Sequence, residues 1–165
     1  MKDTSLKAEV NGLKTRLATL DDIQQICSLY NEFFAYNAGL QPEYCKAAKE
    51  IGEYPKSVIA DESAAILVAV EGSVIIGFVH IRKAQTPPFG SVVPHNYAEI
   101  IDYFVAASCR GKGIGAKLMN FAKQWSKAKN LEYIELSVLS NAREAIHFYE
   151  RENFSVASYT MRCKL

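Results

Sequence analysis

The chain has 165 residues, of which 49% are hydrophobic, and its formal net charge is +1 at pH 7. This length and composition suit one globular domain, and the near-neutral charge gives no reason to expect nucleic acid or an anionic membrane as a partner. No apolar run is long enough to span a bilayer, and residues 1–12 are polar, unlike a signal peptide. We therefore expect a short tail over residues 1–12, one domain over residues 13–165, and a soluble cytoplasmic protein.

The first part of the chain predicts a strand followed by two helices. Leu13–Leu17 is a short strand candidate. Thr19 offers an N-cap for a helix that runs to about Asn37. A second helix is predicted over Glu43–Ile51, after Pro42, because proline is tolerated in the first turn of a helix.

The middle of the chain predicts a sheet built from consecutive strands. Ala65–Val70 and Val74–Lys83 flank a short turn at Gly72, which indicates a hairpin. Thr86–Pro94 contains three prolines and a glycine and is expected to be a loop. Tyr97–Val105 is a third strong strand candidate.

The last third alternates helices and strands. Ile114–Lys127 is an amphipathic helix, followed by a strand at Tyr133–Val138, a helix at Ala142–Arg151 and a closing strand at Phe154–Cys163. The apolar face of the first of these helices carries Ile114, Leu118, Phe121 and Trp125. The order β-α-α-β-β-β-α-β-α-β predicts an α/β domain with a mixed sheet and helices on both of its faces.

The segment of residues 109–116, which reads Cys-Arg-Gly-Lys-Gly-Ile-Gly-Ala, follows a strand candidate and opens a helix candidate. Its three glycines tolerate positive φ and close backbone approach. The free N–H groups at a helix start attract phosphate, and Arg110 and Lys112 add positive charge there. A tight strand-to-helix turn would need the same glycines, so the loop alone is a weak signal.

Three phosphate-binding motifs compete for this loop. It lacks the spacing and the hydroxyl of a P-loop, and it lies too far along the chain for a dinucleotide-binding first strand. Arg110-x-x-Gly113-x-Gly115 after a strand instead resembles motif A of the GNAT superfamily, the acyl-CoA-dependent N-acyltransferases. In that family the N–H groups of the loop hold the pyrophosphate of coenzyme A.

A second motif supports the same family. The segment from Asn141 to Phe154 is similar to motif B, Asn-x-x-Ala-x-x-Phe-Tyr-x-x-x-Gly-Phe, with Asn153 in place of the usual glycine. Asparagine is the next best residue for a left-handed helix end, so this departure costs little. The resemblance covers roughly Leu13 to Leu165.

The resemblance implies that acetyl-CoA is the acyl donor; no metal is expected, because the histidines and cysteines lack metal-ligand spacing. The backbone near Val105 is expected to pair with the pantetheine arm, and one N–H there would polarise the acetyl carbonyl. Asn141 is also expected to cap its helix, with Glu144 completing a capping box. The residues implied to bind the cofactor are Phe104, Val105, Arg110, Gly111, Lys112, Gly113, Ile114, Gly115, Ala116, Asn141 and Tyr149.

Acetyl transfer to an amine requires a base, because a lysine-like amine is almost entirely protonated at neutral pH. Glu99 is the candidate, since it stands eleven residues before Arg110, where the histone-acetylating branch of the family carries its glutamate. Strand alternation places Glu99 with Tyr97 among apolar side chains and Asp102 on the opposite face. Asp102 or a chain of water molecules remains an alternative base. If Glu99 has no catalytic role, it is a solvated glutamate at the end of the strand.

Tyr149 is the candidate general acid. By resemblance, the tyrosine of motif B protonates the departing thiolate, and a phenol with an ordinary pKa near 10 is able to donate to it. The interpretation without a function is a buried aromatic residue in an amphipathic helix.

By resemblance to the family, the acceptor is expected to bind around Phe33–Tyr54 and Thr86–His95, and both segments are rich in aromatic residues. A small-molecule amine, an amino acid and a protein amine all remain open. The sequence therefore predicts an N-acetyltransferase; the alternative is a non-catalytic acyl-CoA sensor or interaction module on the same fold. A homodimer is expected from the habit of the family alone.

Neither the histidines nor the cysteines are spaced as metal ligands or as a catalytic triad. The histidines are His80, His95 and His147, and the cysteines are Cys27, Cys45, Cys109 and Cys163. Isolated cysteines of this kind fit reduced thiols in the cytosol.

Overall fold

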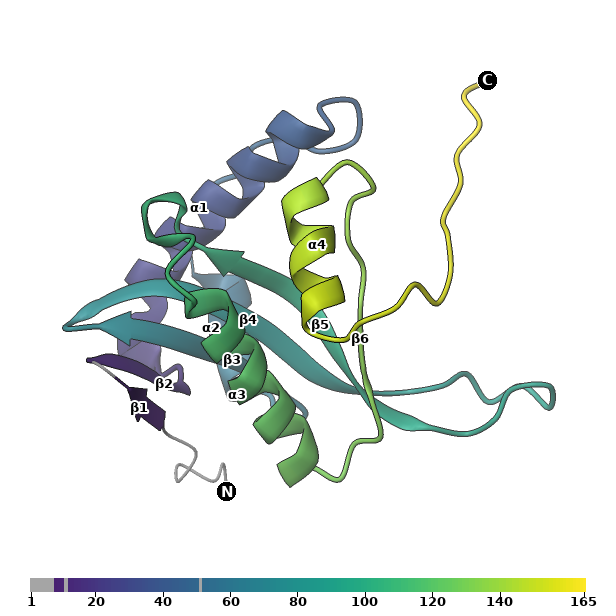
Figure 1. Ribbon diagram of the computed structural model, residues 1–165, viewed down its shortest axis with the longest axis horizontal. Helices are drawn as coiled ribbons and strands as arrows, with labels where there is room; N and C mark the ends of the chain where they lie inside the picture. Colours follow the sequence, from purple (N-terminus) through teal and green to yellow (C-terminus); the bar gives the residue numbers. More distant parts are fainter. Residues whose placement is uncertain (1–7, 11, 51) are drawn as a thin grey trace.

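The computed structural model describes residues 8–10, 12–50 and 52–165, and its centre is a six-stranded sheet in the order β1-β2-β3-β4-β5-β6 (Figure 1). Neighbouring strands are antiparallel except β5 and β6, which are parallel. Helices cover both faces of the sheet, as predicted (Figure 1). No helix among the described residues is long and apolar enough to cross a membrane.

The element bounds agree with most of the predictions. The strands are β1 (Ala8–Val10), β2 (Leu13–Leu17), β3 (Ala64–Glu71), β4 (Val74–Gln85), β5 (Asn96–Val105) and β6 (Ile134–Leu136). The helices are α1 (Ile23–Leu40), α2 (Glu53–Ala60), α3 (Ile114–Ala128) and α4 (Arg143–Arg151). The β3–β4 hairpin and the loop that precedes β5 are confirmed. Strand β1 lies within the segment predicted as a tail and pairs with β2.

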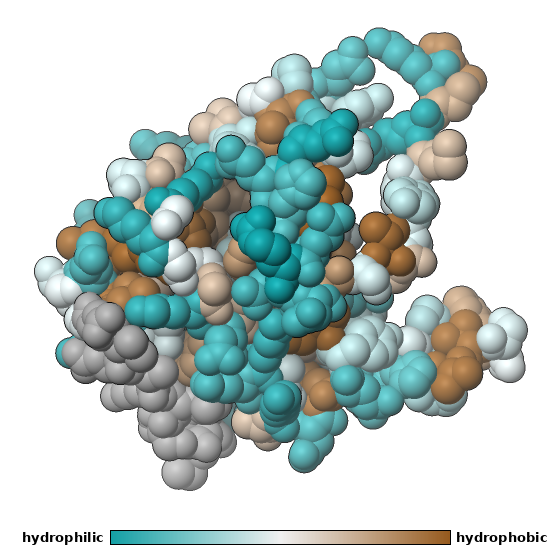
Figure 2. Space-filling view, viewed as in Figure 1, coloured by the Kyte–Doolittle hydropathy of each residue, from teal (hydrophilic) through white to brown (hydrophobic). Residues whose placement is uncertain are grey.

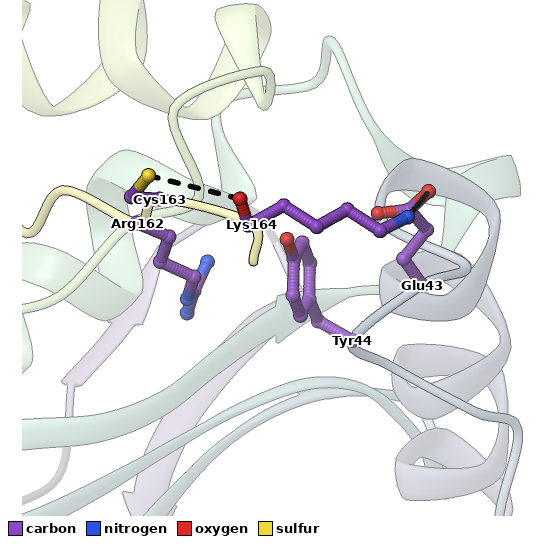
Figure 3. A pocket seen from close by; sticks show the side chains of 5 residues that line it. All are labelled: Glu43, Tyr44, Arg162, Cys163 and Lys164. Atoms are coloured by element: carbon purple, nitrogen blue, oxygen red, sulfur yellow. Dashed lines mark hydrogen bonds and ion pairs between the residues drawn. The ribbon is translucent and has the colours of Figure 1, made fainter.

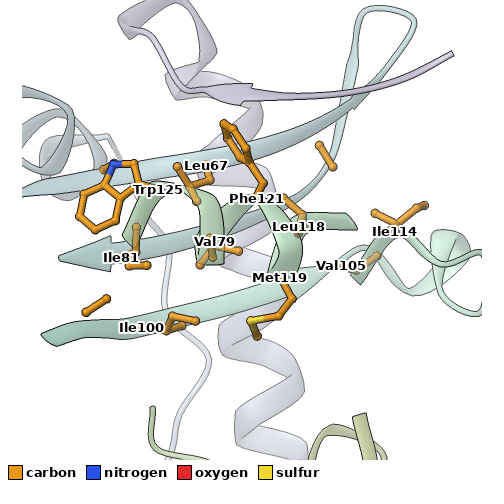
Figure 4. Packing of buried hydrophobic residues seen from close by; sticks show 14 of the residues in the cluster. Leu67, Val79, Ile81, Ile100, Val105, Ile114, Leu118, Met119, Phe121 and Trp125 are labelled. Carbon is orange, nitrogen blue, oxygen red and sulfur yellow. The ribbon is translucent and has the colours of Figure 1, made fainter. Parts of the chain in front are cut away.

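Two apolar layers hold the helices to the sheet, because the central strand β3 is buried on both sides. Helix α3 packs on one face, which we call the α3 face, through the four residues predicted for its apolar side (Figure 4). Helices α1 and α2 cover the other face, the α1/α2 face, where Tyr30 and Phe78 are completely buried. The aromatic rings of Tyr30 and Phe78 are 4.4 Å apart.

The second predicted helix is displaced along the sequence. Residues 42–44 form a turn and 45–50 have no regular structure, so the helix predicted over Glu43–Ile51 is wrong among its described residues; Ile51 lies outside them. Helix α2 follows instead and buries Pro55 and Val58. A short helix is stabilised mainly by the apolar face that it buries, and residues 43–50 offer little such surface. Pro55 sits in the first turn, where no helical hydrogen bond is lost.

The predicted closing strand is also wrong. Residues 154–165 have no regular secondary structure, and β6 is shorter than predicted. The alternating pattern of Phe154–Cys163 favours a strand, but a strand needs a partner, and no described strand pairs with this segment. Figure 1 shows the segment running away from the sheet beyond α4.

Candidate functional site

A β-bulge in β5 decides which side chains face which layer. His80 pairs with Asp102 and Ile81 pairs with Ile100, so Ile101 has no partner on β4. One extra residue reverses the alternation that follows it. Glu99 and Asp102 therefore share the α1/α2 face, which corrects the prediction that they lie on opposite faces.

Beyond the bulge, β5 has an open edge. Its pairing with β6 extends only from Ala98 to Ile100, and β6 ends at Leu136, the partner of Ile100. The N–H of Ala106 donates to Ile76 on β4, so the N–H and carbonyl of the preceding residue, Val105, point away from β4. The backbone of Phe104 faces β4 by the same alternation. The open edge thus offers the backbone of Val105 to a ligand.

The glycine loop lies at the end of this edge. Gly111 and Gly113 have φ values of 78° and 75°, which side chains rarely adopt, and a Cβ at either position would meet no atom within 4 Å. The first backbone bond of α3 runs from Lys117 to Gly113, so the N–H groups before Lys117 point out of the helix end. This geometry fits a phosphate group.

Gly115 has a different role from the other two glycines. It lies inside α3, and a Cβ there would be 3.3 Å from Phe148 and 3.4 Å from the hydroxyl of Tyr103. Tyr103 also donates a hydrogen bond to the Gly115 carbonyl. Gly115 therefore permits close packing between α3, β5 and α4. The Ile114 side chain is buried in the core, so only its backbone is available to a ligand.

The charged side chains of the loop differ in placement. Lys112 is exposed, as is Ala116. The Arg110 Nε donates to the Val105 carbonyl at 3.1 Å, and its guanidinium lies 4.9 Å from the Tyr36 ring and 5.3 Å from the Phe104 ring. Arg110 thus crosses the end of the open edge and has to move if a ligand pairs with Val105.

Tyr149 on α4 stands beside the same edge. Its ring lies 6.0 Å from that of Tyr103 on β5 and 5.8 Å from that of Phe154. Burial, and then the neighbouring Tyr36, raise the pKa of Tyr149 above its ordinary value. The phenol therefore keeps its proton at physiological pH, although burial also makes it a weaker acid.

The ends of α4 bear out one sequence expectation and contradict another. Asn153 adopts φ 67°, the left-handed conformation expected for it. The predicted capping box is wrong, because Ala142 is the N-cap and makes no side-chain bond. The Asn141 amide instead donates to the Leu40 carbonyl at 2.6 Å and connects α4 to the end of α1.

Glu99 is held in an ion pair. Its carboxylate lies 2.6 Å from Nη2 and 2.8 Å from Nε of Arg82 on β4, with 30% of the side chain exposed. The apolar surroundings predicted for Glu99 are therefore not found.

Asp102 belongs to a polar cluster that sequence analysis missed, which we call the His80 network: Tyr30, Tyr54, His80 and Asp102. The Tyr30 hydroxyl donates to Asp102 at 3.0 Å, and His80 Nδ1 lies 2.9 Å from the Tyr54 hydroxyl and 3.5 Å from Asp102 Oδ2. His80 is 5% exposed. One sequence signal was available, because His80 is the single titratable residue in the apolar run from Ile75 to Ile81.

The segments expected to bind the acceptor lie partly at the surface. An opening of about 650 Å³ is lined by Glu43 and Tyr44 on one side and by the C-terminal segment on the other (Figure 3). Arg162 lies 4.5 Å from the Tyr44 ring and Lys164 lies 3.6 Å from Glu43. The loop before β5 projects from the body and carries an apolar patch at its tip (Figure 2).

Within residues 8–10, 12–50 and 52–165, no three His, Cys, Asp or Glu side chains are grouped to hold a metal ion, and all four cysteines are free.

Comparison with known proteins connects these features. Residues 23–154 match the family model described as acetyltransferase (GNAT) family. An uncharacterized N-acetyltransferase of Methanocaldococcus jannaschii is 31% identical over 147 residues, which cover 87% of this chain and 62% of that protein. The chain thus spans less than two thirds of this relative. An uncharacterized N-acetyltransferase of Archaeoglobus fulgidus is 27% identical over 141 residues, covering 86% and 92%.

Solved structures share the fold at low sequence identity. A tetramutant of a Bacillus halodurans protein has a TM-score of 0.87 and 23% identity, covering 92% of this chain and 99% of its own. An aminoglycoside acetyltransferase from an uncultured soil metagenomic sample has a TM-score of 0.72 and 18% identity, covering 94% and 96%.

Proposed function

The chain belongs to the GNAT family of acetyltransferases, and we propose that it transfers an acetyl group from acetyl-CoA to a primary amine by direct attack. The observation that carries this proposal is the open edge of β5, which has the glycine loop at one end and Tyr149 beside it. Acetyl-CoA binding and an amine acceptor are both part of the proposal.

The loop is proposed to anchor the pyrophosphate through N–H groups between Arg110 and Ala116, with Arg110 and Lys112 supplying charge. Support comes from the left-handed glycines and the free helix end of α3. Replacing Arg110 with alanine is expected to weaken coenzyme A binding about tenfold or more, because a charge-assisted hydrogen bond is lost. Calorimetry with coenzyme A measures this, and Lys127→Ala, at the far end of α3, is the matched control.

The pantetheine arm is proposed to run along β5, where the Val105 backbone faces outward and pairs with it, while an outward-facing N–H nearer the bulge polarises the acetyl carbonyl. The arm enters at the loop and meets the paired part of the sheet at Ile100, so the thioester comes to rest near the bulge. Tyr149 is proposed to donate its proton to sulfur as the C–S bond breaks. Glu99 and Asp102 are the candidate acceptors of the amine proton.

The test is an assay with acetyl-CoA, thiol detection and a panel of amines. The panel holds polyamines, amino acids, peptides and an aminoglycoside, the last because a fold neighbour is described as an aminoglycoside acetyltransferase. With the best amine, Tyr149→Phe is expected to lower kcat by about 10²–10⁴-fold. Tyr159→Phe, at a residue 84% exposed, is the control.

A non-catalytic acyl-CoA sensor on the same fold is the alternative, and it predicts coenzyme A binding without thiol release on any amine. The cytoplasm remains the location that we propose, since all four cysteines are free thiols.

A further inference from the structure

The His80 network joins four elements, α1, α2, β4 and β5, and two of its side chains face one ring nitrogen of His80. Tyr54 of α2 and Asp102 of β5 both face Nδ1 of His80, while Tyr30 of α1 donates to the same Asp102 oxygen, Oδ2. Asp102 is 15% exposed along its side chain and His80 6%. Polar groups buried this deeply are stable only in a fixed arrangement of donors and acceptors.

Two groups lie beside Nδ1, the Tyr54 hydroxyl and the Asp102 carboxylate, and the proposal places the ring proton of His80 between them. A carboxylate oxygen accepts hydrogen bonds, so a bare Nδ1 would place a lone pair against an acceptor. An N–H at Nδ1 instead donates to both the Asp102 carboxylate and the Tyr54 hydroxyl oxygen. The remaining nitrogen, Nε2, is then the proton-accepting atom of the ring, because a neutral imidazole carries one proton.

The two tyrosines of the network remain proton donors rather than bases. Burial, and then the charge of Asp102, raise the pKa of Tyr54 to about 12, and the same causes raise the pKa of Tyr30 further. The other charged groups facing the network are Arg82 of β4, Glu99 of β5 and Glu50 from the segment before α2. Glu99 is already bound to Arg82.

The position of the network relates it to the reaction. Asp102 follows the bulge directly, and His80 is its cross-strand partner. Both therefore lie beside the point on β5 where pairing with β6 ends and the open edge begins. On the proposed path of the pantetheine arm, this is where the thioester ends. Tyr54, which is 40% exposed, connects the network to the surface of the α1/α2 face.

We propose that His80 accepts the proton of the acceptor amine, and that Asp102 and Tyr54 are positioning residues that hold its ring; this inference rests on the acetyl transfer proposed above. A proton passes from the amine nitrogen to His80, directly or through one water. The electron pair on that nitrogen then forms the bond to the acetyl carbon. The C–S bond breaks, and sulfur takes the proton of Tyr149. Tyr149 and His80 then exchange protons with water. Asp102 stabilises the charged imidazole meanwhile.

The first arm of the test is kinetic and uses the best amine of the panel. His80→Gln is expected to lower kcat per folded molecule about 10²-fold or more, with coenzyme A binding kept. Imidazole added to the buffer partly rescues His80→Ala. His147→Gln, an exposed histidine of α4, is the matched control and keeps full activity.

The second arm needs no acceptor. Nitrogen NMR of the protein in mildly alkaline buffer is expected to show His80 protonated at Nδ1, and Asp102→Asn to lose this preference. Tyr54→Phe, a change at a partly exposed residue, is expected to lower kcat several-fold without changing the KM for acetyl-CoA. A wild-type His80 protonated at Nε2, or wild-type turnover in His80→Gln, overturns the inference alone. A wild type inert on every amine overturns the proposed function and the inference with it.

Discussion

The two faces of the sheet bury different kinds of side chain. The α3 face is filled by aliphatic and aromatic groups from α3 and the strands (Figure 4). The α1/α2 face is also aromatic, but it carries His80 among its buried residues, and Asp22 is buried just before α1. Apolar packing stabilises without regard to direction, whereas buried polar groups require particular partners.

This difference separates two tasks. The α3 face fixes the helix whose first turn completes the glycine loop, so its packing sets the position of the proposed cofactor site. The α1/α2 face gives up some apolar packing to hold a network of titratable groups beside the bulge. The bulge connects the two, because it turns Tyr103 toward α3 and Asp102 toward α1.

The largest expected effect comes from the α3 face. Leu118 is completely buried beneath α3, so Leu118→Ala leaves a cavity and is expected to lower the free energy of unfolding by about 2–5 kcal/mol. Denaturant titration measures it, with Leu20→Ala, at a residue 63% exposed, as control. Equal losses in the two variants would contradict the packing described for α3.

On the α1/α2 face, Tyr30→Phe keeps the ring and removes the hydrogen bond to Asp102. We expect a loss of about 1–3 kcal/mol in unfolding free energy, because a buried carboxylate loses a donor. The rate of acetyl transfer per folded molecule is also expected to fall in Tyr30→Phe, whereas in Leu118→Ala it is expected to stay unchanged. A Tyr30→Phe variant with lowered stability and unchanged kcat would separate Tyr30 from the proposed catalytic network.

The sequence predicts the α3 side of this comparison better than the other side. The helix of residues 114–127, its buried positions and the glycine loop all follow from contiguous patterns, and the structure has them where expected. The His80 network does not follow, because Tyr30 and Asp102 are 72 positions apart and meet only through the fold. The bulge at Ile101 depends on strand register, which a single strand sequence does not specify.

The errors at the other elements have the same cause. The segment after residue 154 has the alternation of a strand but no partner strand in the structure. Residues 43–50 carry a helix signal without an apolar face, and the helix forms further on, where Val58 is buried. Local propensity is overridden wherever burial decides.

A smaller effect is expected where β4 approaches β5 and α3. A Cβ on Gly77 would lie 2.9 Å from the Phe104 carbonyl oxygen and 3.1 Å from Leu118. Gly77→Ala is therefore expected to cost about 1–2 kcal/mol by overpacking. Gly39→Ala in α1, where nothing lies within 4 Å, is expected to be neutral or slightly stabilising, because alanine favours helix. Thermal unfolding of both variants tests the pair, and a loss in Gly39→Ala as large as in Gly77→Ala would contradict it.

The smallest effect concerns the buried charge before α1. Burial raises the pKa of Asp22, but hydrogen bonds from Arg16 and Thr19 outweigh it, so the pKa lies below its ordinary 3.8. A carboxylate with a lowered pKa stabilises the folded state above its unfolded value, and this contribution disappears as pH falls through the folded value. Asp22→Asn is therefore expected to lower the melting temperature at pH 7 and to approach the wild type below about pH 4. Asp21→Asn, at an exposed neighbour, is the control. If the difference caused by Asp22→Asn persisted undiminished at low pH, the contribution of Asp22 would come from packing rather than from its charge.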